Sequence, residues 1–299
     1  MSGPQLAVGK VQIRCLADAT VDYPWPLAEL FPGVPDGAWE PFRARYPSAF
    51  GGPTVWRSCY RCFLLRTEQE TLLFDTGMGP AGSPLAKVFG MAGRLHEELR
   101  DAGAAPEDID IVILSHLHPD HVGGNLRRDG AHLQLAFPNA RYLVNDADWN
   151  AFHQPEVQRH FPFAFVESTI TPLETLGALE LITGEHAVTD EVTLVAAPGH
   201  TPGHMTARIE SERERALLVG DALLHPAQVT EPEWSSMFDM DPDQDRQTRR
   251  QLLDELESQD LLFAASHFPY PGFGRIVSHA GRRYWQPRSA DGEPPMVAG

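Results

Sequence analysis

Residues Ser115 to Gly124 read Ser-His-Leu-His-Pro-Asp-His-Val-Gly-Gly, so three histidines and one aspartate fall within six positions. A protein core tolerates one histidine whose hydrogen bonds are satisfied, but burying three beside an aspartate without partners is costly. Binding a metal ion would satisfy all four side chains, because neutral imidazole and carboxylate are both common ligands of zinc-like metals. The segment therefore predicts a metal site.

The same design recurs at other places in the chain, where a short apolar run ends abruptly in histidine or aspartate. Continuous apolar runs of this length predict strands buried on both faces, and loops just past strand ends are where sites are commonly built. We therefore expect these loops to converge. The runs are Asp110–Ser115 before His116, Val192–Ala197 before Pro198-Gly-His200, Ala216–Gly220 before Asp221, and Leu261–Ser266 before His267.

These motifs, in this order, resemble the signature of the metallo-β-lactamase superfamily. The HxHxDH motif at 116–121 is followed by Pro-Gly-His-Thr-Pro-Gly-His at 198–204, Gly-Asp at 220–221 and a late His267, and Leu-Phe-Asp-Thr-Gly at 73–77 matches the family's early Asp-Thr-Gly element. The resemblance spans roughly residues 55–280. It implies an α+β fold, the four-layer αββα sandwich, with metals at one edge.

Carried over by position, the resemblance implies two divalent metal ions. His116, His118 and His200 would hold the first ion, and Asp120, His121 and His267 the second. Asp221 would bridge the two ions, and Asp120 would also steer protons as a catalytic group. Zinc is the first expectation, with Mn, Fe or Co as alternatives because they accept the same donors.

The resemblance implies hydrolysis of an ester, a lactone or a phosphotriester by a metal-bridging hydroxide. The chain looks most similar to the N-acyl homoserine lactonases and the methyl parathion hydrolase-like group, and segments 238–242 and 266–274 resemble the latter more. Many lactonases carry a tyrosine three residues after the bridging aspartate. Leu224 stands there in this chain, and we take it as a pocket residue.

Two alternatives remain open. A glyoxalase II-type thioester hydrolase has matching metal ligands, although it usually carries late basic residues and the last third of this chain has Arg but no Lys. A non-catalytic metal-binding protein of the same fold is the second, but structural zinc sites are usually closed by four Cys or His ligands. Two carboxylates among seven ligands favour an open catalytic site.

The formal net charge of −17 argues against a nucleic-acid partner, because affinity for phosphates comes mainly from Lys and Arg. The sequence contains no run of eighteen apolar residues, which a membrane span would need, and residues 1–10 lack the features of a secretory signal. We therefore expect a cytoplasmic protein with a small-molecule substrate. Cys59 and Cys62 form a CxxC inside an apolar strand pattern, which favours buried cysteines over a redox or zinc site.

The predicted organisation has three parts. Residues 1–50 are expected to form an irregular extension packed on the core, residues 51–285 the catalytic domain, and residues 286–299 a flexible tail. The extension's aromatic residues would pack on its own domain by default, or would cover a pocket or contact a second subunit in a homodimer. These aromatic residues are Trp25, Phe31, Trp39 and Phe42.

Within the catalytic domain, residues 55–65 and 71–75 predict a strand hairpin, and apolar spacing predicts one amphipathic helix over 84–102. A further helix is predicted over 242–257, with Asp241 as its N-cap.

Several single residues also carry expectations. Trp149 and Phe152 are candidates for an apolar substrate pocket, and Asp75 is expected to orient a ligand histidine through a hydrogen bond. His204 should brace its own loop. The remaining histidines without a motif are expected to pack or lie at the surface, namely His153, His225 and His279.

Overall fold

Two mixed β-sheets form the centre of the protein in the computed structural model, which describes residues 3–130, 132–161 and 165–288. The first sheet has the order β1-β2-β4-β5-β6-β9-β10, with β3 paired to β4, and the second has the order β11 to β17, in which β14 and β15 pair in parallel. A small hairpin, β7 (Leu126–Asp129) and β8 (His132–Leu135), stands apart. The strands of the first sheet are β1 (Gln5–Val8), β2 (Val11–Pro26), β3 (Phe50–Gly52), β4 (Val55–Arg66), β5 (Thr71–Phe74), β6 (Ile111–Ile113), β9 (Arg141–Asn145) and β10 (Leu179–Ile182). Those of the second are β11 (His186–Ala187), β12 (Val192–Ala196), β13 (Met205–Ser211), β14 (Glu214–Leu218), β15 (Leu262–Ala264), β16 (Phe273–His279) and β17 (Arg282–Pro287).

Three apolar clusters hold the layers together. One lies between the sheets and joins side chains such as Phe63 and Phe74 of the first sheet to Leu194 and Leu218 of the second. Because strand side chains alternate between faces, β4 also sends Leu64 to the outer face, where helices cover it. The four-layer αββα sandwich predicted from the sequence is confirmed.

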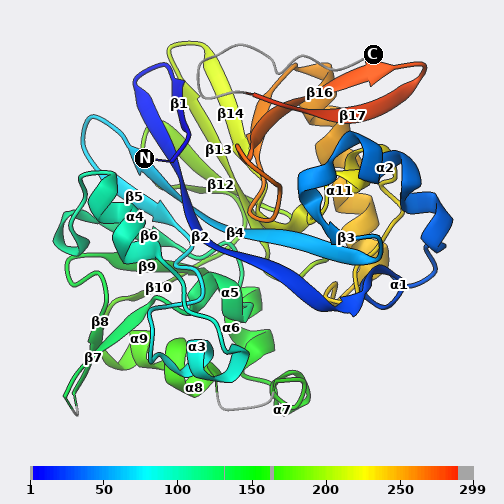
Figure 1. Ribbon diagram of the computed structural model, residues 1–299. Helices are drawn as coiled ribbons and strands as arrows, with labels where there is room; N and C mark the ends of the chain where they lie inside the picture. The colour runs from blue at the N-terminus through cyan, green and yellow to red at the C-terminus, as the bar shows by residue number, and fades with distance from the viewer. Residues whose placement is uncertain (1–2, 131, 162–164, 289–299) are drawn as a thin grey trace.

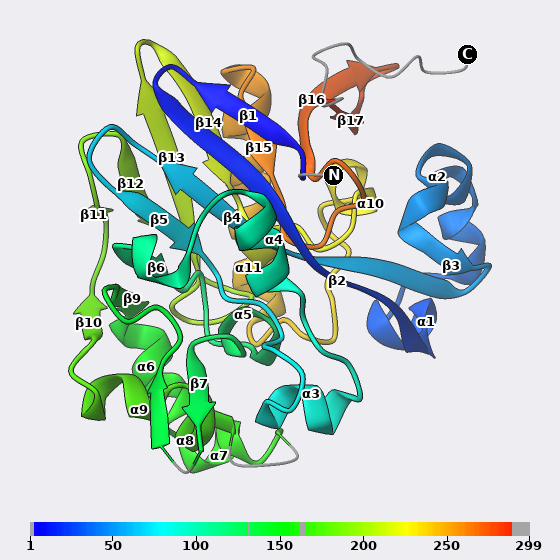
Figure 2. The same cartoon turned by 60° about the vertical axis from the view of Figure 1, so that its left-hand side comes forward.

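The helices gather in two groups on opposite sides of the strands (Figures 1 and 2). Against the first sheet lie α3 (Pro84–Phe89), α4 (Leu95–Asp101), α6 (Asp146–Phe152), α7 (Pro155–Gln158), α8 (Phe165–Thr169) and α9 (Thr171–Thr175). On the side of the second sheet lie α1 (Leu27–Leu30), α2 (Glu40–Arg45), α10 (Ala227–Thr230) and α11 (Pro242–Ser258).

The prediction that the first fifty residues form an irregular extension is wrong in part. Strand β2 runs to Pro26 because it pairs with β4 almost throughout, and a register shift between Asp22 and Pro26 accommodates the prolines. Short helical elements follow, and their apolar side chains pack on the outer face of the second sheet. Phe31, Trp39 and Phe42 are buried in this cluster, whereas Trp25 is 44% exposed. The aromatic segment therefore packs mainly on its own domain.

The single helix predicted over 84–102 is two helices. Gly90 ends α3 in the left-handed conformation, with φ 64°, and α4 begins only at Leu95. Gly90 allows this break because it has no Cβ to clash there. The helix predicted over 242–257 is confirmed as α11, and the Asp241 side chain accepts a hydrogen bond from the Gln244 N–H as its N-cap.

The hairpin predicted over 55–75 is confirmed by β4 and β5. The tail predicted from residue 286 begins too early, because β17 pairs with β16 as far as Pro287. Residues 289–299 lie outside the described residues.

Asp18 is a buried carboxylate that fixes two loops near the end of the first sheet. It sits where β2 shifts register, and its oxygens accept the N–H groups of Met78 and Leu95 at 2.8 and 2.9 Å. A Cβ on Gly77 or Gly93 would lie 2.3 Å from an Asp18 oxygen, so both positions need glycine. Burial raises the Asp18 pKa to about 6 from 3.8, although its backbone hydrogen bonds oppose the shift.

We expect this group to make the protein less stable as pH rises from 4.5 to 7. The folded state binds the Asp18 proton more tightly than the unfolded state, so its favourable contribution is complete below pH 3.8 and disappears through about pH 6. The loss over that range is about 2 kcal/mol at 1.36 kcal/mol per pKa unit. Chemical denaturation of the wild type and Asp18→Asn at several pH values measures it. Equal pH slopes for the two proteins would contradict the prediction.

Candidate metal centre

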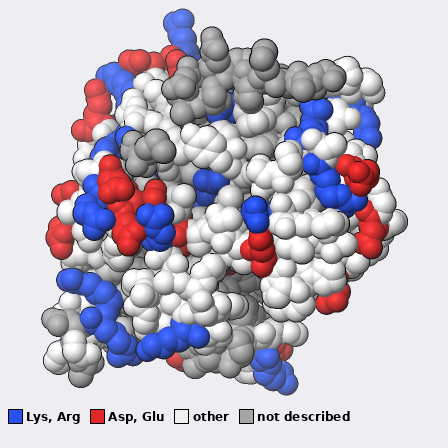
Figure 3. All heavy atoms as spheres, in the orientation of Figure 1, with Lys and Arg blue, Asp and Glu red and all other residues white. Residues whose placement is uncertain are grey.

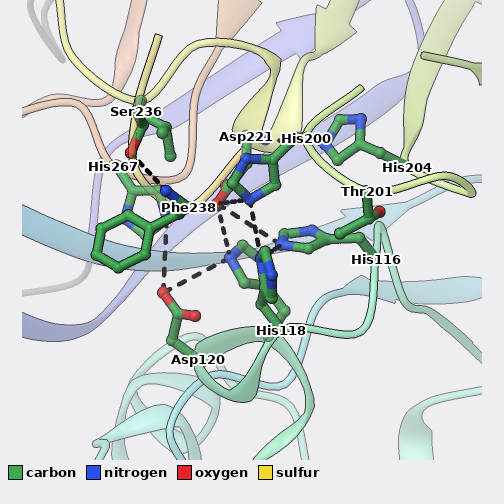
Figure 4. A network of polar contacts seen from close by, with 12 residues as sticks. His116, His118, Asp120, His200, Thr201, His204, Asp221, Ser236, Phe238 and His267 are labelled. Atoms are coloured by element: carbon green, nitrogen blue, oxygen red, sulfur yellow. Dashed lines mark hydrogen bonds and ion pairs between the residues drawn. The ribbon is translucent and has the colours of Figure 1, made fainter. Parts of the chain in front are cut away.

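All four strands predicted to precede the site are present, as β6, β12, β14 and β15. Strand β6 belongs to the first sheet, and the other three belong to the second. Both sheets therefore contribute loops to one edge of the sandwich, where the predicted side chains meet (Figure 4). The short helix α5 (Pro119–Val122) carries Asp120 and His121.

His116, His118 and His200 form one compact group. The His118 Nδ1 lies 3.1 Å from His116 Nε2 and 2.9 Å from His200 Nε2. Burial and neighbouring histidines hold the pKa of His116 and of His118 well below 6.5, so both rings are neutral and have a free lone pair. Nitrogens held at about 2 Å by one tetrahedral zinc ion would lie roughly 3.3 Å apart, close to this spacing.

Asp120, His121 and His267 form a second group beside the first. The Asp120 Oδ2 lies 3.7 Å from His121 Nε2 and 3.5 Å from His267 Nε2. Burial lowers the His121 pKa, but Asp221, Asp75 and Asp120 together raise it well above 6.5. The raised pKa indicates that the surroundings of His121 strongly favour a positive charge.

Asp221 lies between the two groups. Its Oδ2 is 3.7, 3.4 and 3.0 Å from the Nε2 atoms of His116, His200 and His267, and 3.3 Å from that of His121. Burial raises the Asp221 pKa, but His121, His267 and His116 overcome this and hold it well below 3.8. The side chain is therefore an anion among converging imidazoles.

Within the described part of the chain, two buried atoms of this cluster have no hydrogen-bond partner, namely His121 Nε2 and Asp221 Oδ1. Such orphaned polar atoms are rare and call for an explanation, which an ion would supply. Each of the two groups, and also His116, His121 and Asp221, offers ligand atoms within 4.8 Å of one another. The residues present therefore fit metal ions bound at this edge.

The outward-facing nitrogens of the histidines are also held. Asp75 Oδ2 lies 2.8 Å from His121 Nδ1, and the same carboxylate accepts the Ser115 N–H and hydroxyl. This is the geometry expected of Asp75. His204 hydrogen-bonds Ala197 O within its own loop and accepts the Asp221 N–H at 3.0 Å.

Three supporting residues were not predicted from the sequence. Asp239 Oδ1 lies 2.9 Å from His200 Nδ1, and Ser58 Oγ lies 3.0 Å from His267 Nδ1. Asp148, on α6, accepts hydrogen bonds from Leu117 N, Thr201 Oγ1 and Gly203 N, and so ties two ligand loops together. Each comes from a loop or element distant in the chain, so the metal-ligand motifs do not signal it. Hydrogen bonds of this kind fix ring orientation and tautomer in metal sites.

The predicted pocket residues have different surroundings. The Phe152 ring is buried 5.7 Å from that of His118, and Leu224 is buried in the cluster behind the second sheet. Trp149 is partly buried against His153. A hollow of about 600 Å³ opens nearby, and Phe161 links it to the site, with its ring 6.4 Å from that of His118. The hollow is lined by Pro155, Gln158, Arg159, Phe161, Phe165, Val166 and Glu167.

The other expectations concern isolated residues. His153 hydrogen-bonds Trp149 O and Thr171, His225 is buried among aromatic rings, and His279 is exposed. Cys59 and Cys62 are free thiols on β4, and Cys62 is buried as expected, whereas Cys59 is only partly buried. Basic and acidic side chains lie side by side at several places on the face drawn in Figure 3. No helix in the described part of the chain is long and apolar enough to cross a membrane.

An αββα sandwich with a histidine and aspartate cluster at its edge defines the class of protein. The model of the metallo-beta-lactamase superfamily matches residues 60–267, and the chain belongs to this superfamily. The family resemblance inferred from the motifs is confirmed.

Known relatives give the context. An N-acyl homoserine lactonase of Bacillus sp. is 31% identical over 171 residues, which cover 53% of this chain and 61% of that enzyme's length. The structure of the hydrolase AbOPH of the beta lactamase superfamily superimposes with a TM-score of 0.81 at 25% identity, covering 97% of this chain and 98% of the other. AidC, described as a dizinc quorum-quenching lactonase, shares the fold with a TM-score of 0.79 at 24% identity, over 96% and 98% of the two chains.

Proposed function

We propose that the chain is a dinuclear metal-dependent hydrolase that cleaves an ester, a lactone or a phosphotriester. The observation that carries the proposal is the pair of adjacent ligand groups with the Asp221 carboxylate between them. The similarity to lactonases and to a hydrolase of the same superfamily supports it.

His116, His118 and His200 would hold one ion and Asp120, His121 and His267 the other, with Asp221 shared. Zinc is the first choice, and Mn, Fe or Co suit the same donors. Bound there, two such ions would supply an activated water near neutral pH and would polarise a substrate oxygen.

The chain's own residues define the rest of the site. Asp120 has a side chain 19% exposed, whereas His121, His267 and Asp221 are at most 3% exposed. Asp120 is therefore the most exposed of these four ligands, and we assign it the role of passing protons between the site and water. The hollow beside Phe161 would take the apolar portion of the substrate, with Phe152 behind it.

The test combines metal analysis with turnover on one protein sample. We expect about two metal ions per chain by plasma mass spectrometry. We also expect hydrolysis of at least one of an acyl homoserine lactone, an aryl ester and a phosphotriester, lost on chelation and restored by metal. A thioester included in the panel tests the glyoxalase II-type alternative. Two metals with no turnover of any substrate would favour the non-catalytic alternative, and no metal after reconstitution would refute the proposal.

A further inference from the structure

Two tyrosines from neighbouring strands meet at the edge of the metal centre. Tyr23 lies on β2 and Tyr60 on β4, and their hydroxyl oxygens are 2.9 Å apart. Tyr60 is 7% exposed and Tyr23 is partly buried. Nothing in the sequence motifs points to either residue.

The pair faces the site. Side chains two apart on a strand share a face, and Ser58, two residues before Tyr60, reaches His267 Nδ1 at 3.0 Å. The Tyr60 ring itself meets that of His267 edge-on, with centroids 5.2 Å apart. Tyr23 packs on Phe238, with ring centroids 5.7 Å apart.

The hydroxyl pair has one O–H donor that the hydrogen bond between the two tyrosines does not use. Two phenols carry two O–H donors, and their mutual hydrogen bond consumes one of them. Among the described residues, neither hydroxyl has another hydrogen-bond partner. One O–H is therefore available to an acceptor that the protein itself does not supply.

Both phenols are neutral donors. The ordinary pKa of a tyrosine hydroxyl is about 10, so both O–H groups are protonated near neutral pH.

We propose that the Tyr23–Tyr60 pair donates a hydrogen bond to the substrate oxygen that gains negative charge on the His267 side of the site. One tyrosine donates to the other, and the second donates to the substrate. The inference rests on the proposed function, because it assumes that an oxyanion forms there. It assigns substrate contact to two residues outside the metal-binding motifs.

The test uses phenylphosphonate, a tetrahedral anion that binds without turnover, with metal-loaded protein in a calorimeter. Tyr23→Phe and Tyr60→Phe should each weaken binding about tenfold, the value of one hydrogen bond. Because the two hydroxyls act as one unit, the double variant should be no weaker than the weaker single variant. On any substrate that is hydrolysed, kcat should fall about tenfold with KM nearly unchanged.

Tyr46→Phe is the matched control, since Tyr46 is buried in the same part of the chain and its hydroxyl bonds the Trp285 carbonyl. It should leave phosphonate binding unchanged. Metal content must be equal in all variants, and a loss of metal in Tyr23→Phe or Tyr60→Phe would reduce the pair to a structural role and overturn the inference. Unchanged phosphonate affinity, or no binding by the wild type, would also overturn it. The proposed function is tested separately, and it fails if the metal-loaded wild type hydrolyses no substrate of the panel.

Discussion

Replacing Asp221 with asparagine is expected to lower bound metal below two ions per chain and to reduce hydrolysis at least about a thousandfold. The Asp221 Oδ2 is the atom that the two groups of histidines share, at 3.0 to 3.7 Å from four imidazole nitrogens. The amide removes the negative charge that stabilises positive charge in this buried place. A loss of about 4 kcal/mol in transition-state stabilisation corresponds to a thousandfold in rate.

The matched control is Asp254→Asn, the same chemical change on α11. Its side chain is 69% exposed and pairs with Arg283, so metal content and turnover should stay at the wild-type level. Metal analysis and kcat/KM on the best substrate measure both variants. Two tightly held metals in Asp221→Asn, with activity within tenfold of the wild type, would show that Asp221 is not a shared ligand.

Local patterns were sufficient for the parts of the fold that local physics determines. The apolar runs before His116, His200, Asp221 and His267 are strands, as predicted. β6 and β15 are buried throughout, as expected of a continuous apolar run, whereas β12 alternates between buried and more exposed residues. Their polar ends predicted the convergence of the loops. Asp241 similarly marked the start of α11, because the cap uses neighbours in sequence.

What the sequence did not reveal depends on distant partners. Asp148 and Asp239 act on loops 31 to 55 residues away in the chain, so their burial has no signature in their own neighbourhoods. The prediction of one helix from the apolar spacing over 84–102 took no account of Gly90, whose left-handed conformation ends α3. Residues 1–50 were predicted to be irregular, whereas β2 pairs with β4 as far as Pro26.

The second large effect is expected on replacing Asp239, because its side chain hydrogen-bonds the His200 nitrogen that points away from the metal centre. Its Oδ1 lies 2.9 Å from His200 Nδ1 and its Oδ2 accepts the Ser236 N–H at 2.7 Å. A carboxylate can only accept a hydrogen bond here, so the Nδ1 of His200 is the protonated nitrogen. The lone pair on the Nε2 of His200 therefore faces the site. Both side chains are almost fully buried.

Asp239→Asn should therefore weaken metal binding about 10- to 100-fold, the usual cost of losing such a partner. An amide offers one acceptor and one donor, so it cannot satisfy both His200 and Ser236, and the ring loses its fixed tautomer. Competition with a chromophoric chelator measures the affinity. Asp241→Asn, two residues away, is the control, because asparagine caps a helix as well as aspartate does. Equal metal affinity for the two variants would mean that the orientation of His200 comes from its own loop, whereas a loss confined to Asp239→Asn would show that a residue outside the metal-ligand motifs sets the strength of the metal centre.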